Sequence, residues 1–241
     1  MPASTSKNIK DPFLALPLKS QCDELGIDLD ILHLPKNDKV WIFSDKAFTK
    51  PEPAAFAHFE SHGFKGNFCE GSAPLMLMKC ASLNFLSEAN TFNDRSDACL
   101  GYFEAQCTIL QTSSGRIVDK IRGATTEDIR RHFSEIHSKS LYSTLYPEMS
   151  IDGLLAIWQS IGATGWAKIA EAFLIDPYTF RAGWPDLSVA SGNSLRFIEI
   201  KTSDKLHSSQ KETFSKLLIP LGLHVSVLKL AQPNPSFKRD A

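Results

Sequence analysis

Three residues near the C-terminal end of the chain have the types and the spacing for metal-assisted chemistry. Twelve residues separate Asp186 from Glu199, and Lys201 stands two positions after Glu199. Residues two apart on a strand point to one face, so Glu199 and Lys201 share a face while Ile200 points into the core. If a hairpin pairs the two strands, both carboxylates meet, and the Ile200 carbonyl is an additional candidate ligand. The pattern predicts a site for Mg²⁺ or Mn²⁺, which bind oxygen ligands.

Such a set suits phosphodiester hydrolysis. A divalent cation activates a water molecule and offsets charge on the phosphorus, and Lys201 would position the water or stabilise the developing negative charge. Taken singly, Asp186 is an ordinary turn residue and the other two are an ordinary solvated strand face. The convergence of all three on one hairpin face favours the catalytic interpretation.

The last third of the chain contains the elements that must position these residues. Residues 185–190 and 195–201 predict two strands, because the second alternates between apolar and polar residues, and the Ser-Gly-Asn-Ser stretch between them is typical of a hairpin turn. A helix over 208–218 and a strand over 223–230 follow. The order hairpin, helix, strand is that of a mixed α/β sheet.

The first two thirds predict mainly helices. Residues 1–35 contain four prolines and predict an irregular arm with one short helix, residues 40–43 predict a strand, and residues 111–123 read as polar and turn-like. Helices are predicted over 54–62, 74–88, 96–110, 126–138, 150–159 and 165–173. The predicted organisation is an N-terminal arm over 1–50, partly disordered, a helical part over 51–175, a catalytic core over 176–231 and a disordered tail over 232–241.

The composition of the chain says less about its function than the Asp186, Glu199 and Lys201 pattern does. The chain has 241 residues and a net charge of −1, so any nucleic-acid surface must be local. Its five cysteines form no C-x-x-C pair, which favours reduced core thiols over a zinc site. No secretory signal is visible, and the longest apolar stretch, near 74–86, is too short and too polar to span a bilayer. We expect a cytoplasmic protein without a membrane partner, nucleoid-associated if bacterial.

Three stretches of this sequence resemble the VRR-NUC nuclease domain. They are R-A-G-W-P-D-L at 181–187, F-I-E-I-K at 197–201 and S-Q-K at 209–211. Upstream, residues 59–72, which end in C-E-G-S, resemble the segment that opens the nuclease module of the Fanconi-anaemia-associated nuclease family. The resemblance covers roughly residues 54–230.

The resemblance implies a PD-(D/E)xK fold, that is, an α/β (α+β) mixed sheet with flanking helices preceded by a mainly helical region. It also implies Mg²⁺ or Mn²⁺ and a structure-selective DNA nuclease that acts on flaps, junctions or crosslink-repair intermediates. By position, Glu70 would hold metal together with Asp186, Glu199 and the Ile200 carbonyl; without the resemblance, Glu70 reads as a first-turn residue that favours the helix dipole. Lys201 would assist the nucleophile, and a glutamine, Gln210, would orient the site from the following helix.

Two features leave alternatives open. The family continues its E-V-K strand with G-P-x-D, whereas this chain reads T-S-D after Lys201, one residue shorter before the helix. Arg181, Lys205 and Lys211 are candidate phosphate contacts, although a solvated helix face explains Lys211 equally well. The alternatives are a dimeric resolvase of the Holliday-junction type and a non-catalytic DNA-binding subunit, and a protein partner or a homodimer would supply further DNA contacts.

Overall fold

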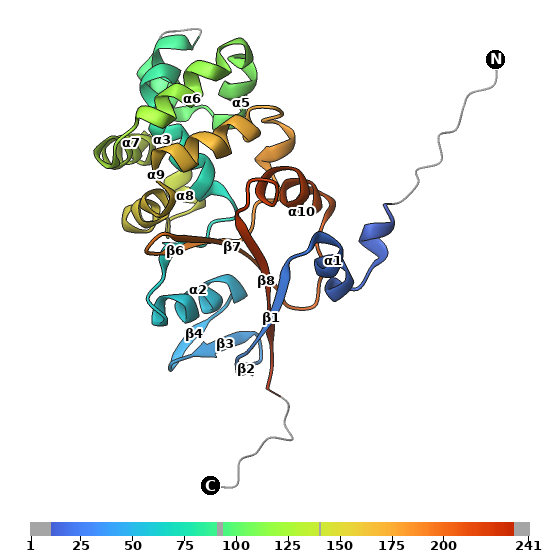
Figure 1. Cartoon of the computed structure of the whole chain (residues 1–241). Coiled ribbons are helices and arrows are strands. Elements are labelled where there is room, and N and C mark those ends of the chain that lie inside the picture. Colours follow the sequence, from blue (N-terminus) through green and yellow to red (C-terminus); the bar gives the residue numbers. More distant parts are fainter. Residues whose placement is uncertain (1–10, 91–93, 140, 234–241) are drawn as a thin grey trace, which may run out of the picture.

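The computed structural model describes residues 11–90, 94–139 and 141–233. A five-stranded sheet of order β1-β8-β7-β6-β5 forms the centre, and a three-stranded sheet of order β2-β3-β4 lies beside it (Figure 1). The strands are β1 Asp28–His33, β2 Lys36–Asn37, β3 Val40–Phe43, β4 Lys46–Phe48, β5 Lys65–Asn67, β6 Leu187–Ser191, β7 Ser194–Lys201 and β8 His224–Ala231.

Most helices form a layer above the large sheet, while α2 and the small sheet lie below it (Figure 1). The helices are α1 Leu18–Leu25, α2 Pro51–Ser61, α3 Ser72–Ala89, α4 Arg95–Leu100, α5 Phe103–Ile109, α6 Ser114–Gly123, α7 Thr126–Lys139, α8 Tyr142–Leu145, α9 Ile151–Phe173 and α10 Ser208–Thr213. Short 3₁₀ turns lie at Pro12–Ala15, Gln111–Ser113 and Thr179–Arg181, and α10 continues into a π-helical turn at Phe214–Leu218. The mixed α/β fold with flanking helices is the one expected from the sequence.

The predicted hairpin is present and fixes the register of the site. β6 and β7 are antiparallel, with Leu187 opposite Ile198 and Ser191 opposite Ser194. The turn places Gly192 at φ +56°, a left-handed conformation that glycine adopts without steric cost. β8 then pairs parallel to β7 after the α10 crossover, and β1 pairs parallel to β8. The start of β6 and the end of β7 therefore meet at one end of the sheet, which is called the sheet edge below.

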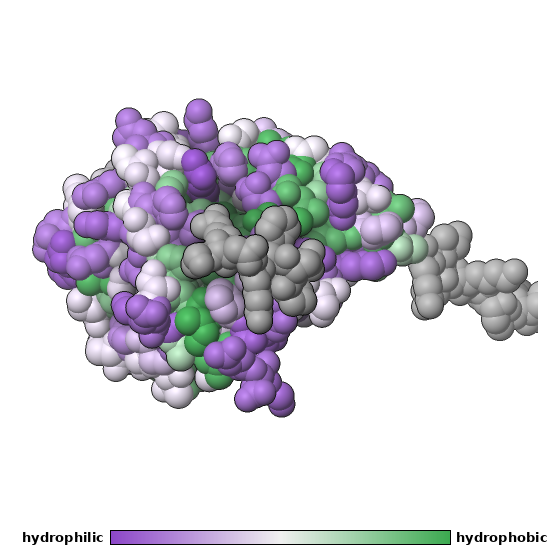
Figure 2. Space-filling view, turned by 90° about the horizontal axis from the view of Figure 1, so that it is seen from below, coloured by the Kyte–Doolittle hydropathy of each residue, from purple (hydrophilic) through white to green (hydrophobic). Residues whose placement is uncertain are grey.

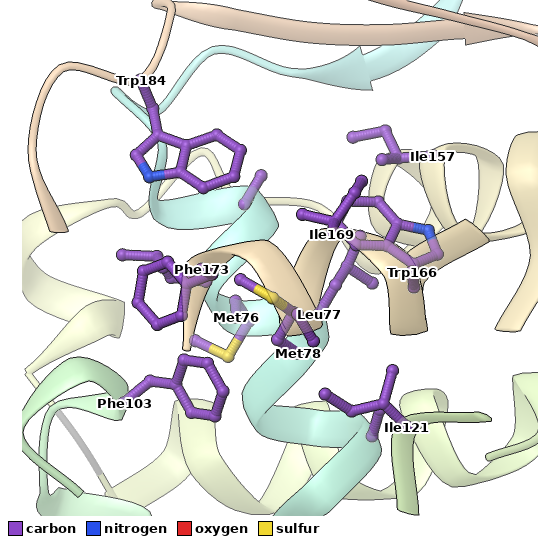
Figure 3. Packing of buried hydrophobic residues seen from close by; sticks show 14 of the residues in the cluster. Met76, Leu77, Met78, Phe103, Ile121, Ile157, Trp166, Ile169, Phe173 and Trp184 are labelled. Atoms are coloured by element: carbon purple, nitrogen blue, oxygen red, sulfur yellow. The ribbon is translucent and has the colours of Figure 1, made fainter. Parts of the chain in front are cut away.

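Two hydrophobic cores cover the two faces of the large sheet. The larger core joins the sheet to the helical layer, where α3 is buried along most of its length. Figure 3 shows Met76 and Met78 of α3 close to Phe103 and Phe173, with Trp184 projecting toward the same cluster from the segment before β6. The smaller core lies between the opposite sheet face, which contributes Ile200, and the elements α2 and β3. The sheet is therefore held from both sides, which makes it a rigid support for residues at its edge.

Part of the irregular arm expected over residues 1–35 is regular in the structure. Residues 18–25 form α1, in keeping with the one short helix expected, but residues 28–33 form β1, an edge strand of the large sheet that was not predicted. All six β1 residues pair with residues 226–231 of β8, far away in sequence, and a local pattern does not reveal such a partner. Residues 1–10 lie outside the described residues, as do residues 234–241 of the predicted tail.

Three further differences concern helices and one short strand. Residues 114–123 form α6 rather than a turn, the predicted helix over 96–110 is divided at Gly101 into α4 and α5, and residues 65–67 form the edge strand β5, for which no strand was predicted. The two helices predicted over 150–159 and 165–173 are both present within α9, on either side of a non-helical backbone at Gly162. The polar residues of 114–123 read as a turn, but packing of α6 against α3 and α9 overrides that local preference.

The surface and the cysteines agree with the composition. Hydrophobic residues gather in patches among hydrophilic ones on the face seen from below (Figure 2). Among the described residues no helix is both long and apolar enough to cross a bilayer. All five cysteines are buried free thiols, as expected for core residues. A cleft lined by Asp186, Glu199 and Lys201 lies at the end of the sheet where β6 begins and β7 ends.

Candidate active site

The hairpin brings the first carboxylate to the end of the second strand. Because Leu187 pairs with Ile198, the preceding residue, Asp186, lies beside Glu199 and Ile200. Its Oδ2 accepts a hydrogen bond from the Ile200 backbone N–H at 2.8 Å. The Ile200 side chain is buried in the opposite core, as predicted. The hydrogen bond fixes the Asp186 carboxylate at the sheet edge.

Glu199 and Lys201 share a face of β7 and contact each other directly. The Lys201 Nζ lies 2.8 Å from Glu199 Oε1 and 3.2 Å from Asp204 Oδ2. Glu199 is 2% and Lys201 3% exposed, so this ion pair is largely removed from water. Asp204 was not singled out from the sequence, although its position three residues after Lys201 places it within reach. The structure thus adds a second carboxylate partner for the lysine.

Gln210 connects the following helix to the same carboxylate. Its Nε2 donates to Glu199 Oε1 at 2.5 Å, and its own Oε1 accepts from the His207 backbone N–H at 2.9 Å. The second bond belongs to a capping box at the start of α10, in which the side chain of the third helical residue bonds back to the cap. The shortened connection after Lys201 therefore still delivers Gln210 to the site.

The half-buried Asp186 and the buried Glu199 have unusual titration properties. Burial, and then the neighbouring Glu199 carboxylate, raise the pKa of Asp186 well above its usual range. Burial also raises the pKa of Glu199, against the opposing effect of Lys201. For Lys201, burial alone would lower the pKa, but the Glu199 and Asp204 carboxylates outweigh it and raise the pKa. The cause in each case is negative charge concentrated out of water.

Glu70 lines the same cleft as Asp186 and Glu199, two residues before α3 begins. It is exposed and has a φ of +45°, and Gly71 follows with a φ of +78°. A Cβ at Gly71 would lie 2.3 Å from the Trp184 Cβ, so only glycine allows this segment to approach the residues before Asp186 so closely. A left-handed backbone at a glutamate is uncommon and costs about 1 kcal/mol or more. The local fold therefore holds Glu70 in an unfavoured conformation at the cleft.

The cleft itself has a volume of about 450 Å³ and collects nearly all the predicted residues. Its lining includes Glu70, Asp186, Glu199, Ile200, Lys201, Gln210 and Arg181. It also includes Glu52, at the start of α2, and Tyr146, neither of which was predicted. Both residues, with Glu70 and Asp186, also line a neighbouring hollow of about 680 Å³. Glu52 had no sequence signal beyond its flanking prolines, which are typical of a helix start.

A second close approach holds the R-A-G-W-P-D segment against α10. Gly183 has a φ of +81°, and a Cβ there would lie 2.1 Å from the Ser209 backbone oxygen. Trp184 is buried, and its Nε1 donates to the Phe180 backbone oxygen at 2.7 Å. Thr213 of α10 donates to the Ala182 carbonyl at 2.7 Å. These contacts fix the segment that leads into Asp186 to the helix that carries Gln210.

The structure separates the three predicted phosphate-binding residues. Arg181 is exposed in the cleft, with its guanidinium 3.4 Å from the centre of the Tyr178 ring. Lys211 instead makes a salt bridge to Asp11 at 2.9 Å, and Lys205 donates to the Ala15 backbone oxygen at 3.0 Å. Both lysines therefore contact the N-terminal segment. Only Arg181 among the three faces the cleft.

The chemistry of the donor set fits a divalent cation. Glu199 Oε2 is buried and has no hydrogen-bond partner, and it belongs to a pair of carboxylates that burial brings together. A hard cation would satisfy such an orphaned oxygen and offset the repulsion between the pair. Across the residues that the structure describes, however, no three His, Cys, Asp or Glu side chains are gathered tightly enough to form a complete metal site. The three-carboxylate ligand set, with Glu70 as its third member, stays a prediction.

Comparisons with known proteins bear on the fold. Two crystal structures of paFAN1 are similar to this chain: one bound to 5′-flap DNA with a two-nucleotide flap and a gap (18% identity, TM-score 0.61), and one with a one-nucleotide flap and a gap (17% identity, TM-score 0.55). Each match covers 89% of this chain but only 41% and 42%, respectively, of the paFAN1 chain. No family model and no curated protein matches the sequence. The chain therefore has a fold similar to that of the FAN1 nuclease and spans about two fifths of the length of the paFAN1 chain.

Proposed function

We propose that this chain is a divalent-metal-dependent nuclease that hydrolyses phosphodiester bonds in branched DNA. The observation that carries the proposal is the pair of neighbouring carboxylates, Asp186 half-buried and Glu199 buried, with an unpartnered Glu199 oxygen and the Lys201 Nζ 2.8 Å from Glu199 Oε1. Packing alone does not favour such a cluster, since each buried charge costs several kcal/mol unless it is compensated. Clusters of this kind are concentrated at catalytic sites.

Each residue has a distinct part in the proposed reaction. A bound Mg²⁺ or Mn²⁺ would supply activation of a water molecule and compensation of phosphate charge. Asp186 and Glu199 would hold the ion, with Glu70 and the Ile200 carbonyl as the further predicted ligands. Lys201 carries a positive charge where negative charge develops on the phosphate in the transition state, and Gln210 keeps Glu199 in one orientation by its hydrogen bond.

The proposed substrate class follows from the similar structures and from charge. Both paFAN1 crystals contain 5′-flap DNA, so flaps and junctions are the first substrates to test. Because Lys205 and Lys211 contact the N-terminal segment, Arg181 alone of the three predicted phosphate contacts lines the cleft. Arg181 is the phosphate contact that the geometry favours. A protein partner or a second copy of the chain would supply the remaining grip on the DNA.

The test is cleavage of labelled 5′-flap, four-way-junction, duplex and single-stranded DNA with Mg²⁺, Mn²⁺ or EDTA. Wild type is compared with Asp186→Ala and with a matched control, Asp119→Ala, whose carboxylate is exposed on α6 and pairs with Arg122. We expect metal-dependent cleavage that Asp186→Ala abolishes and Asp119→Ala retains. Full cleavage by folded Asp186→Ala would refute the assignment. Binding of branched DNA without cleavage would favour the DNA-binding subunit instead.

A further inference from the structure

The segment that precedes the first strand packs against the loop that follows the catalytic lysine. The segment comprises the 3₁₀ turn Pro12–Ala15 and helix α1, and the loop comprises residues 202–207 between β7 and α10. Phe13, Gln21 and Leu206 are all at least 98% buried at this contact. The loop has no helix or strand of its own, so contacts with the N-terminal segment are a main source of its order.

Gln21 is the centre of this contact. Its Oε1 accepts from the Leu206 backbone N–H at 2.9 Å, and its Nε2 donates to the Leu206 backbone oxygen at 3.3 Å. The same Nε2 donates to the Phe13 backbone oxygen at 3.1 Å. One fully buried side-chain amide thus satisfies both backbone groups of a residue that lies 185 positions away in sequence.

Leu206 lies in the chain between Asp204, which contacts Lys201, and Gln210 of α10, which contacts Glu199. Asp204 ion-pairs with Lys201 at 3.2 Å on one side of it. Gln210 donates to Glu199 at 2.5 Å on the other side, from a helix whose capping box begins at His207. A shift of Leu206 therefore moves both contacts at once.

We propose that Gln21 is a positioning residue of the nuclease site: its amide anchors Leu206 and thereby sets the placement of Asp204 against Lys201 and of Gln210 against Glu199. This inference rests on the proposed function for its kinetic consequence, while the anchoring itself is independent of it. Two other links join the same regions, Lys205 to the Ala15 carbonyl and Lys211 to Asp11. Both are partly or fully exposed to water, where such pairs contribute little, so the buried amide is the dominant link.

The experiment compares Gln21→Met with Gln106→Met in the full-length chain. Methionine has nearly the shape of glutamine but cannot make the hydrogen bonds. Gln106 is the matched control, because it is also a buried glutamine whose Nε2 donates to a backbone oxygen, that of Ala98 at 3.0 Å, within the helical layer. A third variant, Gln21→Glu, retains the acceptor for the Leu206 amide and, because a fully buried acid binds a proton, keeps one donor in place of two. Cleavage of flap DNA and amide hydrogen exchange at Leu206 are measured for each.

The expected result is a separation of kcat from KM. A displacement of about 1 Å in catalytic groups lowers rates by about 10²-fold, so Gln21→Met should lower kcat by about that factor with little change in KM. The Leu206 amide should exchange at least about tenfold faster, because it loses its acceptor. Gln106→Met should retain kcat, and Gln21→Glu should fall between wild type and Gln21→Met.

Several outcomes would overturn the proposal. They are an unchanged kcat in folded Gln21→Met, unchanged exchange at Leu206, an equal loss of kcat in Gln106→Met, or the failure of both Gln21 variants to fold, which would assign Gln21 to stability alone. Failure of the proposed function looks different. In that case wild type cleaves no substrate, and faster exchange at Leu206 in Gln21→Met still identifies the anchor.

Discussion

The helical layer and the sheet edge each bury one lysine, but the partners of the two ammonium groups differ: backbone carbonyl oxygens for Lys79 and carboxylates for Lys201. Lys79, in α3, is 0% exposed and donates to the backbone oxygens of Cys99 and Gly101 at 2.6 and 2.5 Å. These oxygens lie at the C-terminal end of α4, where helix carbonyls lack partners within the helix. Lys201, 3% exposed, is instead paired with the carboxylates of Glu199 and Asp204.

The pKa values follow from these partners. Burial lowers the pKa of Lys79 to about 8, since carbonyl dipoles compensate a desolvated charge only in part. The pKa of Lys201 is raised despite its burial, because full negative charges surround it. The comparison teaches that burial alone does not mark a functional lysine. Lys79 completes a helix end, whereas Lys201 offsets the negative charge of the carboxylates that gather around it.

The largest expected effect is on flap cleavage, which replacement of Lys201 should slow and replacement of Lys79 should leave unchanged. Lys201→Met should lower the rate of flap cleavage by about 10²- to 10³-fold, because the positive charge beside the developing phosphate charge is lost. The fold should persist, since Glu199 already has a raised pKa and becomes neutral by binding a proton. Single-turnover kinetics and circular dichroism measure the two properties, and Lys79→Met should cleave at the wild-type rate per folded molecule. A Lys201→Met protein as active as wild type would contradict the comparison.

The next effect tests the backbone that supports the sheet-edge site. Gly183→Ala places a methyl group against the Ser209 oxygen in a backbone region that disfavours alanine. We expect a loss of about 3 kcal/mol in the free energy of unfolding, and slower cleavage because α10 must move. The control is Gly123→Ala at the end of α6, where a Cβ meets nothing within 4 Å. Chemical denaturation should show a change within about 1 kcal/mol for the control.

A third prediction concerns the pH dependence that Lys79 gives to stability. Its folded pKa of about 8 lies below the ordinary 10.5, so between these values the unfolded chain binds more protons than the folded protein. The unfavourable contribution of Lys79 is full below pH 8 and fades as the pH rises to 10.5. The free energy of unfolding of wild type, relative to Lys79→Met, should therefore rise by about 3 kcal/mol across this window. A flat difference between the two proteins in urea titrations would show that Lys79 is not desolvated as described.

The smallest expected effect lies in the ion pair between α4 and α7. Arg95 donates to both Glu135 oxygens, at 2.9 and 2.7 Å, and this hydrogen bonding lowers the pKa of Glu135 to about 2. The stabilisation is present above pH 4.5 and is lost as the pH falls toward 2. Because both side chains are partly exposed, Glu135→Gln should cost only about 1 kcal/mol at pH 7 and nothing near pH 2. Thermal unfolding at the two pH values measures the difference, and flap cleavage should be unaffected.

The sequence predicted the part of the site that depends on local pattern. Alternation over 195–201 and a turn cluster before it specify the hairpin, and the hairpin places Asp186 beside Glu199. The resemblance located Gln210 on the next helix, where its side chain contacts Glu199. The roles assigned to these residues, and the metal, stay predictions.

The contacts that the sequence did not reveal are those between distant segments. Gln21 meets Leu206, and Glu52 enters the cleft from α2, through packing that no periodicity encodes. Asp28–His33 reads as irregular because its polar residues suit an exposed edge strand. Residues 114–123 begin with serine and glycine, yet packing against α3 and α9 makes them helical. Tertiary contacts override local preference in each of these cases.

The pairing of β1 with β8 has a consequence for synthesis on the ribosome. The partners Asp28 and Ser226 are about 200 residues apart, so β1 is made well before its partner strand. Until β8 emerges, β1 has no described neighbour in the sheet, and Gln21 is made long before Leu206. The helical layer, built from consecutive segments, can assemble while the chain is still growing. A nascent chain would therefore hold a folded helical layer before β8 pairs with β1 and β7, so the cleft at the ends of β6 and β7 would take its final shape only after β8 has emerged.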